Sequence, residues 1–349
     1  MIQSPSRDAE NENTPRATVI IINFNSGDRL STIYAALQSQ STQGFDVIVW
    51  DNASTDGSAS IPVPSSLNVS IYRCPENLGF AGGIMAAVSE TKAEWLAILN
   101  PDAYPAPDWL ATLFRATELY GQETVLGSVQ TIADNPAKLD GLGDVYHISG
   151  VAWRGGFDQS ALTAPTEDVE IFCACFAATM VHRETFLLHG GLDTSFFCYH
   201  EDVDFGYRHR LYGGRAVLVH DAIVAHEGSG ITGRYSDFTV YHGIRNRQWT
   251  VIKNTPLALL PIVVPLNIFF TLGFLVRSYM LGHGNAYLKG MLAGYGGIAS
   301  VWRQRGEVLS RRSVRIIDIA KAICWSPIAP FRRAAHFRPI GGSRYSLDD

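Results

Sequence analysis

Short apolar runs that each end in a polar loop repeat four times in the first hundred residues of this chain. Residues 18–22 read Thr-Val-Ile-Ile-Ile, residues 45–50 read Phe-Asp-Val-Ile-Val-Trp, and two further runs cover residues 69–72 and 95–99. Continuous runs of this length are typical of strands buried on both faces of a parallel sheet. Residues 28–40 carry apolar side chains at helical spacing. Strands alternating with helices predict βαβ units and a doubly wound α/β fold with a mostly parallel sheet.

The polar loops that follow these runs carry the first candidate functional residues. Asp51, Asp56 and Asp102 each come just after an apolar run. In open α/β sheets, ligands bind at the carboxyl ends of the strands, although a single Asp there also serves as a turn former or a helix cap. No GxGxxG motif follows the first strand and no GxxxxGK[ST] motif occurs. Dinucleotide-binding dehydrogenases and P-loop NTPases are therefore disfavoured.

The middle of the chain contains its densest group of acidic and aromatic residues. Residues 153–157 and 169–181 are predicted to return to the sheet, with Cys173 and Cys175 inside the second strand rather than at a zinc site. Residues 196–205 read Phe-Phe-Cys-Tyr-His-Glu-Asp-Val-Asp-Phe. The helix macrodipole stabilises acidic side chains at the start of a helix, so these acids could simply belong to a well-capped helix. A buried carboxylate with a raised pKa, suited to general-base catalysis, is the other.

Six segments of the chain, taken in order, resemble glycosyltransferase family 2, whose members are inverting enzymes with the Rossmann-like GT-A fold. The bacterial branch that contains rhamnosyltransferases is the most similar. The resemblance covers roughly residues 17–250. The segments are IIINFNSGD (20–28), VWDNASTDGS (49–58), ENLGFAGG (76–83), LNPDA (99–103), HEDVDFGYRHR (200–210) and VAHEGSG (224–230).

The resemblance assigns one set of residues to the nucleotide part of a nucleotide-sugar donor. It implies that Asp51 binds the base, that the first polar loop lines the nucleotide pocket, and that the ENLGF segment lies near the ribose and diphosphate. The residues of this set are Asn23, Phe24, Asn25, Asp51, Asn77, Gly79 and Phe80.

The same resemblance implies a metal site and a catalytic base. Asp102 stands where the family has the last Asp of its DxD motif, with Asn100 in the first position, and would bind Mg²⁺ or Mn²⁺ together with His226. From the residues alone, His226 is expected just past a strand at 216–219, and a structural role for it stays open. Asp202 would be the catalytic base, supported by Glu201. A hard cation on carboxylate oxygens suits a diphosphate leaving group.

The last hundred residues combine an apolar segment with a basic tail. No charged residue occurs between positions 254 and 276, which is long enough for a membrane span of ~20 residues. Three prolines in it leave open a kinked, re-entrant or interfacial helix, or the core helix of a soluble protein. Residues 301–349 carry ten Lys or Arg and four Asp or Glu, so the net charge of −5 hides a tail of +6. Isoleucines and alanines between 316 and 323 favour an amphipathic membrane-surface helix over an RNA-binding segment.

These observations predict three regions and one function. Residues 1–16 are expected to be a disordered lead-in without the apolar core of a signal peptide, residues 17–250 a GT-A catalytic domain, and residues 251–349 a helical, membrane-associating extension. The expected function is metal-dependent, inverting transfer of a sugar, with rhamnose from dTDP-rhamnose as the first candidate, to a lipid-linked or growing polysaccharide acceptor. The expected location is the cytoplasmic face of the bacterial inner membrane, with no nucleic-acid partner. The alternatives are a UDP-hexose transferase and a non-catalytic membrane scaffold.

Overall fold

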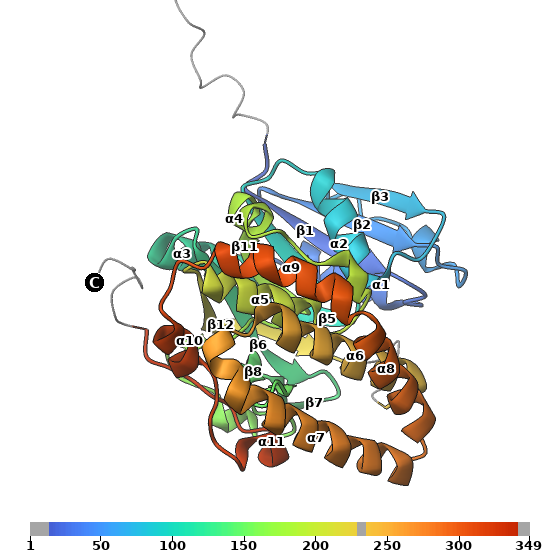
Figure 1. Ribbon diagram of the computed structural model, residues 1–349. Helices are drawn as coiled ribbons and strands as arrows, with labels where there is room; N and C mark the ends of the chain where they lie inside the picture. The colour runs from blue at the N-terminus through green and yellow to red at the C-terminus, as the bar shows by residue number, and fades with distance from the viewer. Residues whose placement is uncertain (1–13, 229–234, 341–349) are drawn as a thin grey trace, which may run out of the picture.

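The computed structural model describes residues 14–228 and 235–340, and its core is one large mixed sheet (Figure 1). The predicted lead-in therefore lies almost wholly outside the described residues. The strand order is β10-β12-β6-β11-β4-β1-β2-β3, with β5 paired to β12 and β7 to β6. The strands are β1 (Ala17–Asn23), β2 (Phe45–Asn52), β3 (Val69–Cys74), β4 (Trp95–Leu99), β5 (Ala103–Pro105), β6 (Thr124–Ile132), β7 (Asn135–Gly141), β10 (Val169–Ile171), β11 (Ala178–His182) and β12 (Arg215–His226).

The four apolar runs found in the sequence form the parallel part of this sheet. Strands β4, β1, β2 and β3 lie next to one another and run parallel, as the βαβ pattern predicts. Strand β11 then inserts antiparallel between β4 and β6, while β6 and β12 are again parallel. The predicted α/β fold is thus confirmed, with a mixed sheet.

Helices cover both faces of the sheet, and the side chains of β1 show why this strand is apolar throughout. Val19 and Ile21 pack in one core with α1 (Arg29–Gln38) and α3 (Trp109–Tyr120). Ile20 and Ile22 pack in a second core with α2 (Gly79–Ser89), α4 (Arg183–Leu188) and α5 (Glu201–Leu211). Successive residues of a strand point to opposite faces, so a strand between two helical layers must be apolar at every position.

Three predicted boundaries are wrong. Residues 169–181 form two strands rather than one, because β10 pairs with β12 at the edge of the sheet while β11 lies between β4 and β6. The buried connector at 172–177 contains both cysteines. Residues 153–157 do not join the main sheet: β9 (Ala152–Arg154) pairs with β8 (Asp144–Tyr146) in a separate two-stranded sheet. Strand β12 continues to His226, which pairs with Ala103 of β5 instead of lying in the following loop.

The C-terminal third is helical and packs against the catalytic part. Helix α6 (Asp237–Asn254) contacts α5, α8 (Gly284–Gly296) and α9 (Ile298–Ser310), and it runs without a break through residue 250, the predicted boundary between the two parts. The other helices are α7 (Leu260–Met280), α10 (Ile316–Ala322) and α11 (Ala329–Arg332).

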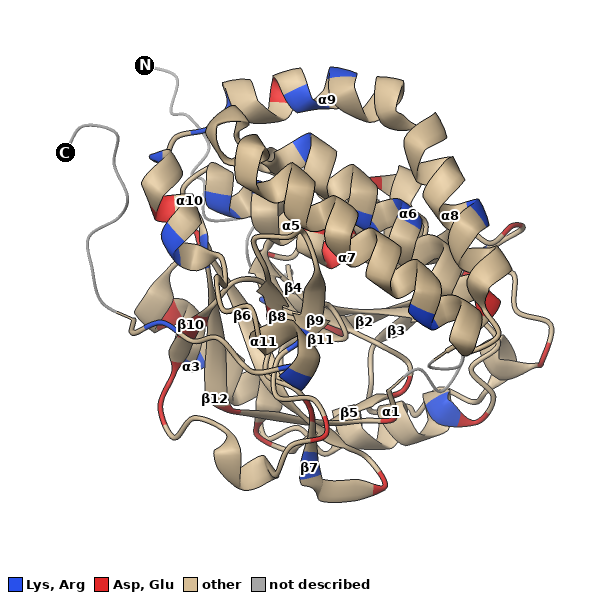
Figure 2. Cartoon of the chain, turned by 60° about the horizontal axis from the view of Figure 1, so that its bottom comes forward, with Lys and Arg blue, Asp and Glu red and all other residues tan. Residues whose placement is uncertain are grey.

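Two segments of this third were expected to meet a membrane, and they differ in exposure. Residues 257–280 are long and apolar enough to cross a membrane, and only 28% of their most apolar window is buried in the protein. Helix α10 contains one basic residue, Lys321, which is exposed, and one acidic residue, Asp318, so this region carries both colours in Figure 2. Its Ile319 and Ala322 are packed in a hydrophobic cluster with α5 and the start of α7. The apolar face of α10 therefore faces the protein, whereas α7 leaves apolar side chains exposed.

Candidate active site

A cavity of about 1720 Å³ opens between the carboxyl ends of β1, β2 and β4 and the helices α6, α7 and α11. Its lining includes side chains from the nucleotide-binding set, the metal pair and the predicted base. The predicted residues that line it are Phe24, Asn77, Gly79, Phe80, Asp102, Glu201, Asp202 and His226.

Three predicted nucleotide-binding residues, Asn23, Asn25 and Asp51, do not line this cavity. Asn23 and Asp51 are aligned neighbours at the ends of β1 and β2, and both are buried. Asn23 Nδ2 donates a hydrogen bond to Asp51 Oδ1 at 2.7 Å, which ties the two loops together. The Asn25 side chain accepts a hydrogen bond from the Thr55 amide at 2.8 Å. Neighbouring side chains in register point to the same side of a sheet, so Asn23 and Asp51 bind one another.

The turn into α2 is held tightly against the loop that precedes the predicted base. Asn77 Oδ1 accepts a hydrogen bond from the Gly79 amide at 2.8 Å, and Asn52 Nδ2 donates one to the Gly79 carbonyl at 2.9 Å. Gly79 has a φ of +72°, and a Cβ on it would lie 2.4 Å from the carbonyl oxygen of Phe197. Only glycine permits both this conformation and this close approach.

The predicted metal pair is assembled from two distant segments. Asp102 follows β4, His226 ends β12, and both are buried. His226 Nε2 lies 3.2 Å from Asp102 Oδ1, and His226 Nδ1 lies 2.7 Å from Asp140 Oδ2. Burial opposes the charge on His226, but the hydrogen bonds to both carboxyl groups outweigh it and raise its pKa. Burial likewise opposes charge on Asp102, yet His226 and the charge of Arg154 lower the pKa of Asp102.

This donor set fits a divalent cation. Asp102 offers a carboxylate oxygen and His226 a ring nitrogen on the same side, while Asp140 accepts from the other ring nitrogen. A carboxylate behind a histidine ligand is the usual arrangement that fixes its orientation and its tautomer. The carboxylate oxygen suits Mg²⁺ or Mn²⁺, and the imidazole nitrogen is a ligand of transition-metal ions.

The predicted base lies at the start of α5, where the three acids have different surroundings. Asp202 is half-buried and lines the cavity, with its Oδ1 accepting a hydrogen bond from the Val203 amide at 2.8 Å. Burial raises the pKa of Asp202. Glu201 is buried with an unpaired Oε2, and burial together with the charge of Asp202 raises its pKa well above the usual range. Asp204 instead forms ion pairs with Arg208 at 2.9 Å and Lys253 at 2.9 Å, so the third acid is structural.

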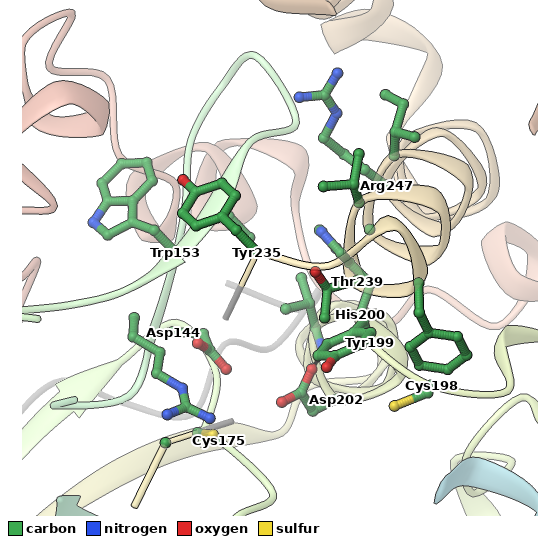
Figure 3. Close-up of a pocket in the computed structure, with 18 of the residues that line it drawn as sticks. Asp144, Trp153, Cys175, Cys198, Tyr199, His200, Asp202, Tyr235, Thr239 and Arg247 are labelled. Carbon is green, nitrogen blue, oxygen red and sulfur yellow. Dashed lines mark hydrogen bonds between the residues drawn. The ribbon is translucent and has the colours of Figure 1, made fainter. Parts of the chain in front are cut away.

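Several residues of the site were not found from the sequence. Asp140, Asp144, Arg154 and Cys175 line the same cavity (Figure 3 shows Asp144, Cys175 and Asp202 facing one another). The segment Asp140-Gly-Leu-Gly-Asp144, two acids spaced by glycines, was the signal that could have pointed to the first two. Arg154 forms an ion pair with Asp140, and its charge lowers the pKa of Asp202.

The group of Asp144, Cys175 and Asp202 also offers three ligand atoms within 4.8 Å of one another. Burial raises the pKa of Cys175 to about 12 and the pKa of Asp144 well above its usual range. A protonated thiol and a protonated carboxyl are poor ligands for a hard cation, and the Arg154 guanidinium lies beside them. Asp102 and His226 are therefore the better candidates for the metal.

Comparison with known proteins identifies the class of protein to which this sheet and cavity belong. The family called glycosyl transferase family 2 matches residues 18–186. These residues are a family 2 domain, and the chain is a glycosyltransferase of this type.

Two curated relatives come from bacteria. N-acetylglucosaminyl-diphospho-decaprenol L-rhamnosyltransferase of Mycobacterium tuberculosis is 24% identical over 239 residues, which cover 62% of this chain and 77% of that protein. The succinoglycan biosynthesis protein ExoO of Rhizobium meliloti is 22% identical over 126 residues, 35% of each chain. The predicted resemblance to rhamnosyltransferases is thereby confirmed.

Solved structures with the same fold are glycosyltransferases of low sequence identity. GalNAc-T7 with UDP, GalNAc and Mn²⁺ gives a TM-score of 0.55 at 15% identity over 70% of this chain, which spans about half (48%) of that chain. The mannosyltransferase PcManGT of Pyrobaculum calidifontis, in complex with GDP-Man and Mn²⁺, gives 0.50 at 16% identity over 86% of each chain. Residues 1–349 of S. aureus TarS with UDP give 0.51 at 12% identity, over 85% of this chain and 91% of that one. These likenesses show the GT-A fold.

Proposed function

We propose that the protein is a metal-dependent, inverting glycosyltransferase that moves a sugar from a nucleotide donor to a lipid-linked acceptor. Rhamnose from dTDP-rhamnose is the favoured donor, and a UDP-hexose is the alternative. The observation that carries this proposal is the cavity lined by Asp102, His226 and Asp202. The names of the mycobacterial relative and of the structures with UDP or GDP-Man support a nucleotide-sugar donor and a lipid-linked acceptor.

In this mechanism each residue has a defined task. The nucleotide rests against Phe24 and Phe80, with Asn77 and Gly79 shaping the turn beside it. Asp102 and His226 would hold a divalent cation, which would supply positive charge opposite the diphosphate leaving group. Asp140 keeps the His226 ring oriented.

Asp202 would accept the proton of the acceptor hydroxyl. The hydroxyl oxygen bonds to the anomeric carbon while the bond from that carbon to the diphosphate oxygen breaks, so the nucleoside diphosphate leaves and the configuration inverts. Burial raises the pKa of Asp202 and makes it a stronger base, while Arg154 keeps it from becoming protonated too readily. Glu201, buried directly before it, supports its position.

The exposed apolar side chains of α7 support attachment to a membrane, where a lipid-linked acceptor resides. We place the protein at the cytoplasmic face of the bacterial inner membrane. Nucleic acid is not a partner in this proposal. A non-catalytic scaffold is the remaining alternative, and the presence of Asp102, Asp202 and His226 in one cavity argues against it.

A panel of nucleotide sugars tests the proposal. Purified full-length protein should bind and slowly hydrolyse one donor with Mn²⁺ or Mg²⁺, and EDTA should abolish the hydrolysis. Asp202→Asn should slow sugar transfer by ~10²–10⁴-fold with unchanged donor affinity. Asp108→Asn, an exposed Asp at the start of α3, is the matched control and should behave like wild type. Binding of no nucleotide or nucleotide sugar would refute the proposed function, and full transfer by Asp202→Asn would refute the role of Asp202.

A further inference from the structure

The end of the cavity that is formed by helices α6, α7 and α11 is lined by four arginines. Arg247 comes from α6, Arg277 from α7, and Arg332 and Arg333 from the end of α11. Among the described residues, none of these four guanidinium groups forms an ion pair with a carboxylate. Four cations around one opening without a counter-ion create a strongly positive site.

Two of these arginines meet at one hydroxyl group. Arg277 Nη2 lies 3.5 Å from the hydroxyl oxygen of Tyr235. The hydrogen bond from Arg277 and the charges of Arg277 and Arg333 lower the pKa of Tyr235, so both guanidinium groups lie near it. Arg333 has a left-handed φ of +47°, and its guanidinium carbon lies 5.0 Å from the centre of the Phe157 ring. Bringing two like charges together on a strained backbone costs energy, which a bound anion would offset.

A third arginine of this end, Arg247, is buried, and not all of its hydrogen-bond donors are used within the described residues. Arg247 is 5% exposed, and its Nη2 donates to Thr271 Oγ1 at 2.6 Å. Its Nε is buried and has no hydrogen-bond partner within residues 14–228 and 235–340. Burying a guanidinium group costs free energy when one of its donors lacks a hydrogen bond and no carboxylate pairs with it among the described residues. An anionic ligand would offset that cost.

Exposed apolar side chains continue the wall of the cavity beyond these arginines. Phe269 of α7 is 67% exposed and Phe331 of α11 is 74% exposed, and both line the opening. Along α7, Leu272, Val276 and Met280 are exposed as well. An anion site that passes directly into an apolar surface matches a ligand with a charged head and a hydrocarbon tail.

We propose that this end binds the diphosphate and the first isoprenoid units of a polyisoprenyl-diphosphate-linked acceptor, an inference that rests on the proposed function. The arginines take the diphosphate, and the exposed faces of α7 and α11 take the lipid. Asp202 lines the same cavity, so a sugar attached to the diphosphate would extend towards the base. Several unpaired guanidinium groups suit the multiple negative charge of a diphosphate, for which arginine offers bidentate hydrogen bonds.

Farnesyl diphosphate is the probe, and its binding to the full-length protein is measured by calorimetry in EDTA, which disfavours diphosphate binding at the metal-dependent donor site. Farnesyl diphosphate should bind more tightly than inorganic diphosphate or farnesol. Arg277→Gln and Arg333→Gln should each weaken its binding roughly 10- to 100-fold, the range expected for a hydrogen bond to a charged group. Phe331→Ser should weaken farnesyl diphosphate but leave inorganic diphosphate unchanged. Arg303→Gln, on α9 and outside the cavity, is the matched control.

Donor binding separates failure of this inference from failure of the proposed function. UDP or dTDP with Mn²⁺ should bind Arg277→Gln and Arg333→Gln as tightly as wild type, which also shows that the variants are folded. If the donor binds but farnesyl diphosphate does not, or if both variants bind it like wild type, the acceptor site is wrong. If phosphatidylglycerol vesicles bind wild-type protein and both variants lose that binding equally, the arginines contact bulk lipid and the proposal is overturned.

Discussion

Replacing Arg154 by Met should destabilise the protein and shift the pH at which it works. The Arg154 guanidinium forms an ion pair with Asp140, lies 3.2 Å from His226 Nδ1 through its Nη1, and lowers the pKa of Asp144 and Asp202 by its charge. Methionine keeps most of the apolar stem but removes every donor. The variant therefore leaves four carboxyl groups without this cation, those of Asp102, Asp140, Asp144 and Asp202.

The size of the effect follows from burial. The Asp140 side chain is 2% exposed and that of Arg154 is 29% exposed. Breaking a fully buried pair costs about 3–5 kcal/mol, and we expect about 2–3 kcal/mol because Arg154 reaches solvent and Asp140 keeps its hydrogen bond to His226. Without the positive charge, the pKa of Asp202 rises further. Because a general base acts only when deprotonated, the acid limb of the pH–rate profile should move to higher pH.

Urea unfolding at pH 8 and the pH dependence of sugar transfer measure the two effects. Arg16→Met is the control, since Arg16 pairs with Glu118 on the surface, where the side chains are 42% and 69% exposed. A surface pair contributes about 0–1 kcal/mol, so the control should change stability by no more than that and leave the pH profile in place. A loss below about 1 kcal/mol for Arg154→Met, with an unchanged acid limb, would refute the reasoning.

Two further predictions concern backbone fit and buried histidines. Gly79→Ala should destabilise the protein by about 2–3 kcal/mol because of its positive φ and the contact with Phe197. Gly57→Ala is the control: Gly57 has a left-handed φ of +84° and ψ of −5°, and no described atom lies within 4 Å of an added Cβ, so this change should cost only about 1 kcal/mol in urea unfolding. Burial lowers the pKa of His189 to about 4 and of His209 to about 3, so the unfolded chain binds more protons below pH 6.5. The free energy of unfolding should therefore be lower at pH 5 than at pH 7, by up to about 2 kcal/mol for each of these histidines. The decrease should be smaller in His209→Gln. Equal unfolding free energies of the wild type at the two pH values would contradict this.

Much of the fold was predictable because burial on both faces leaves a local signal. The runs at 18–22, 45–50, 69–72 and 95–99 became β1, β2, β3 and β4 with small changes at their ends. The connector at 172–177 was mistaken for strand because it is just as apolar, and apolar residues alone do not show whether a backbone pairs with a neighbouring strand.

The site was partly predictable for a similar reason. Asp102 and Asp202 lie in segments with a recognisable pattern, and the structure places both on one cavity. Asp140 and Asp144 have only a weak local signal, two acids spaced by glycines, and Arg154 lies on a short strand that resembles no motif. Their importance comes only from the charges of residues distant in the chain.

Residues close together in the chain were enough to predict the α/β class, the resemblance to glycosyltransferase family 2 and the long apolar segment at 254–276. Tertiary structure decided which acid faces the cavity: Asp202 does, while Asp204 is paired with Arg208 and Lys253. It also decided which apolar surface stays free, since the apolar face of α10 is covered and that of α7 is exposed. Burial and ion pairing depend on what packs against a side chain, and that neighbour is known only once the whole chain has folded.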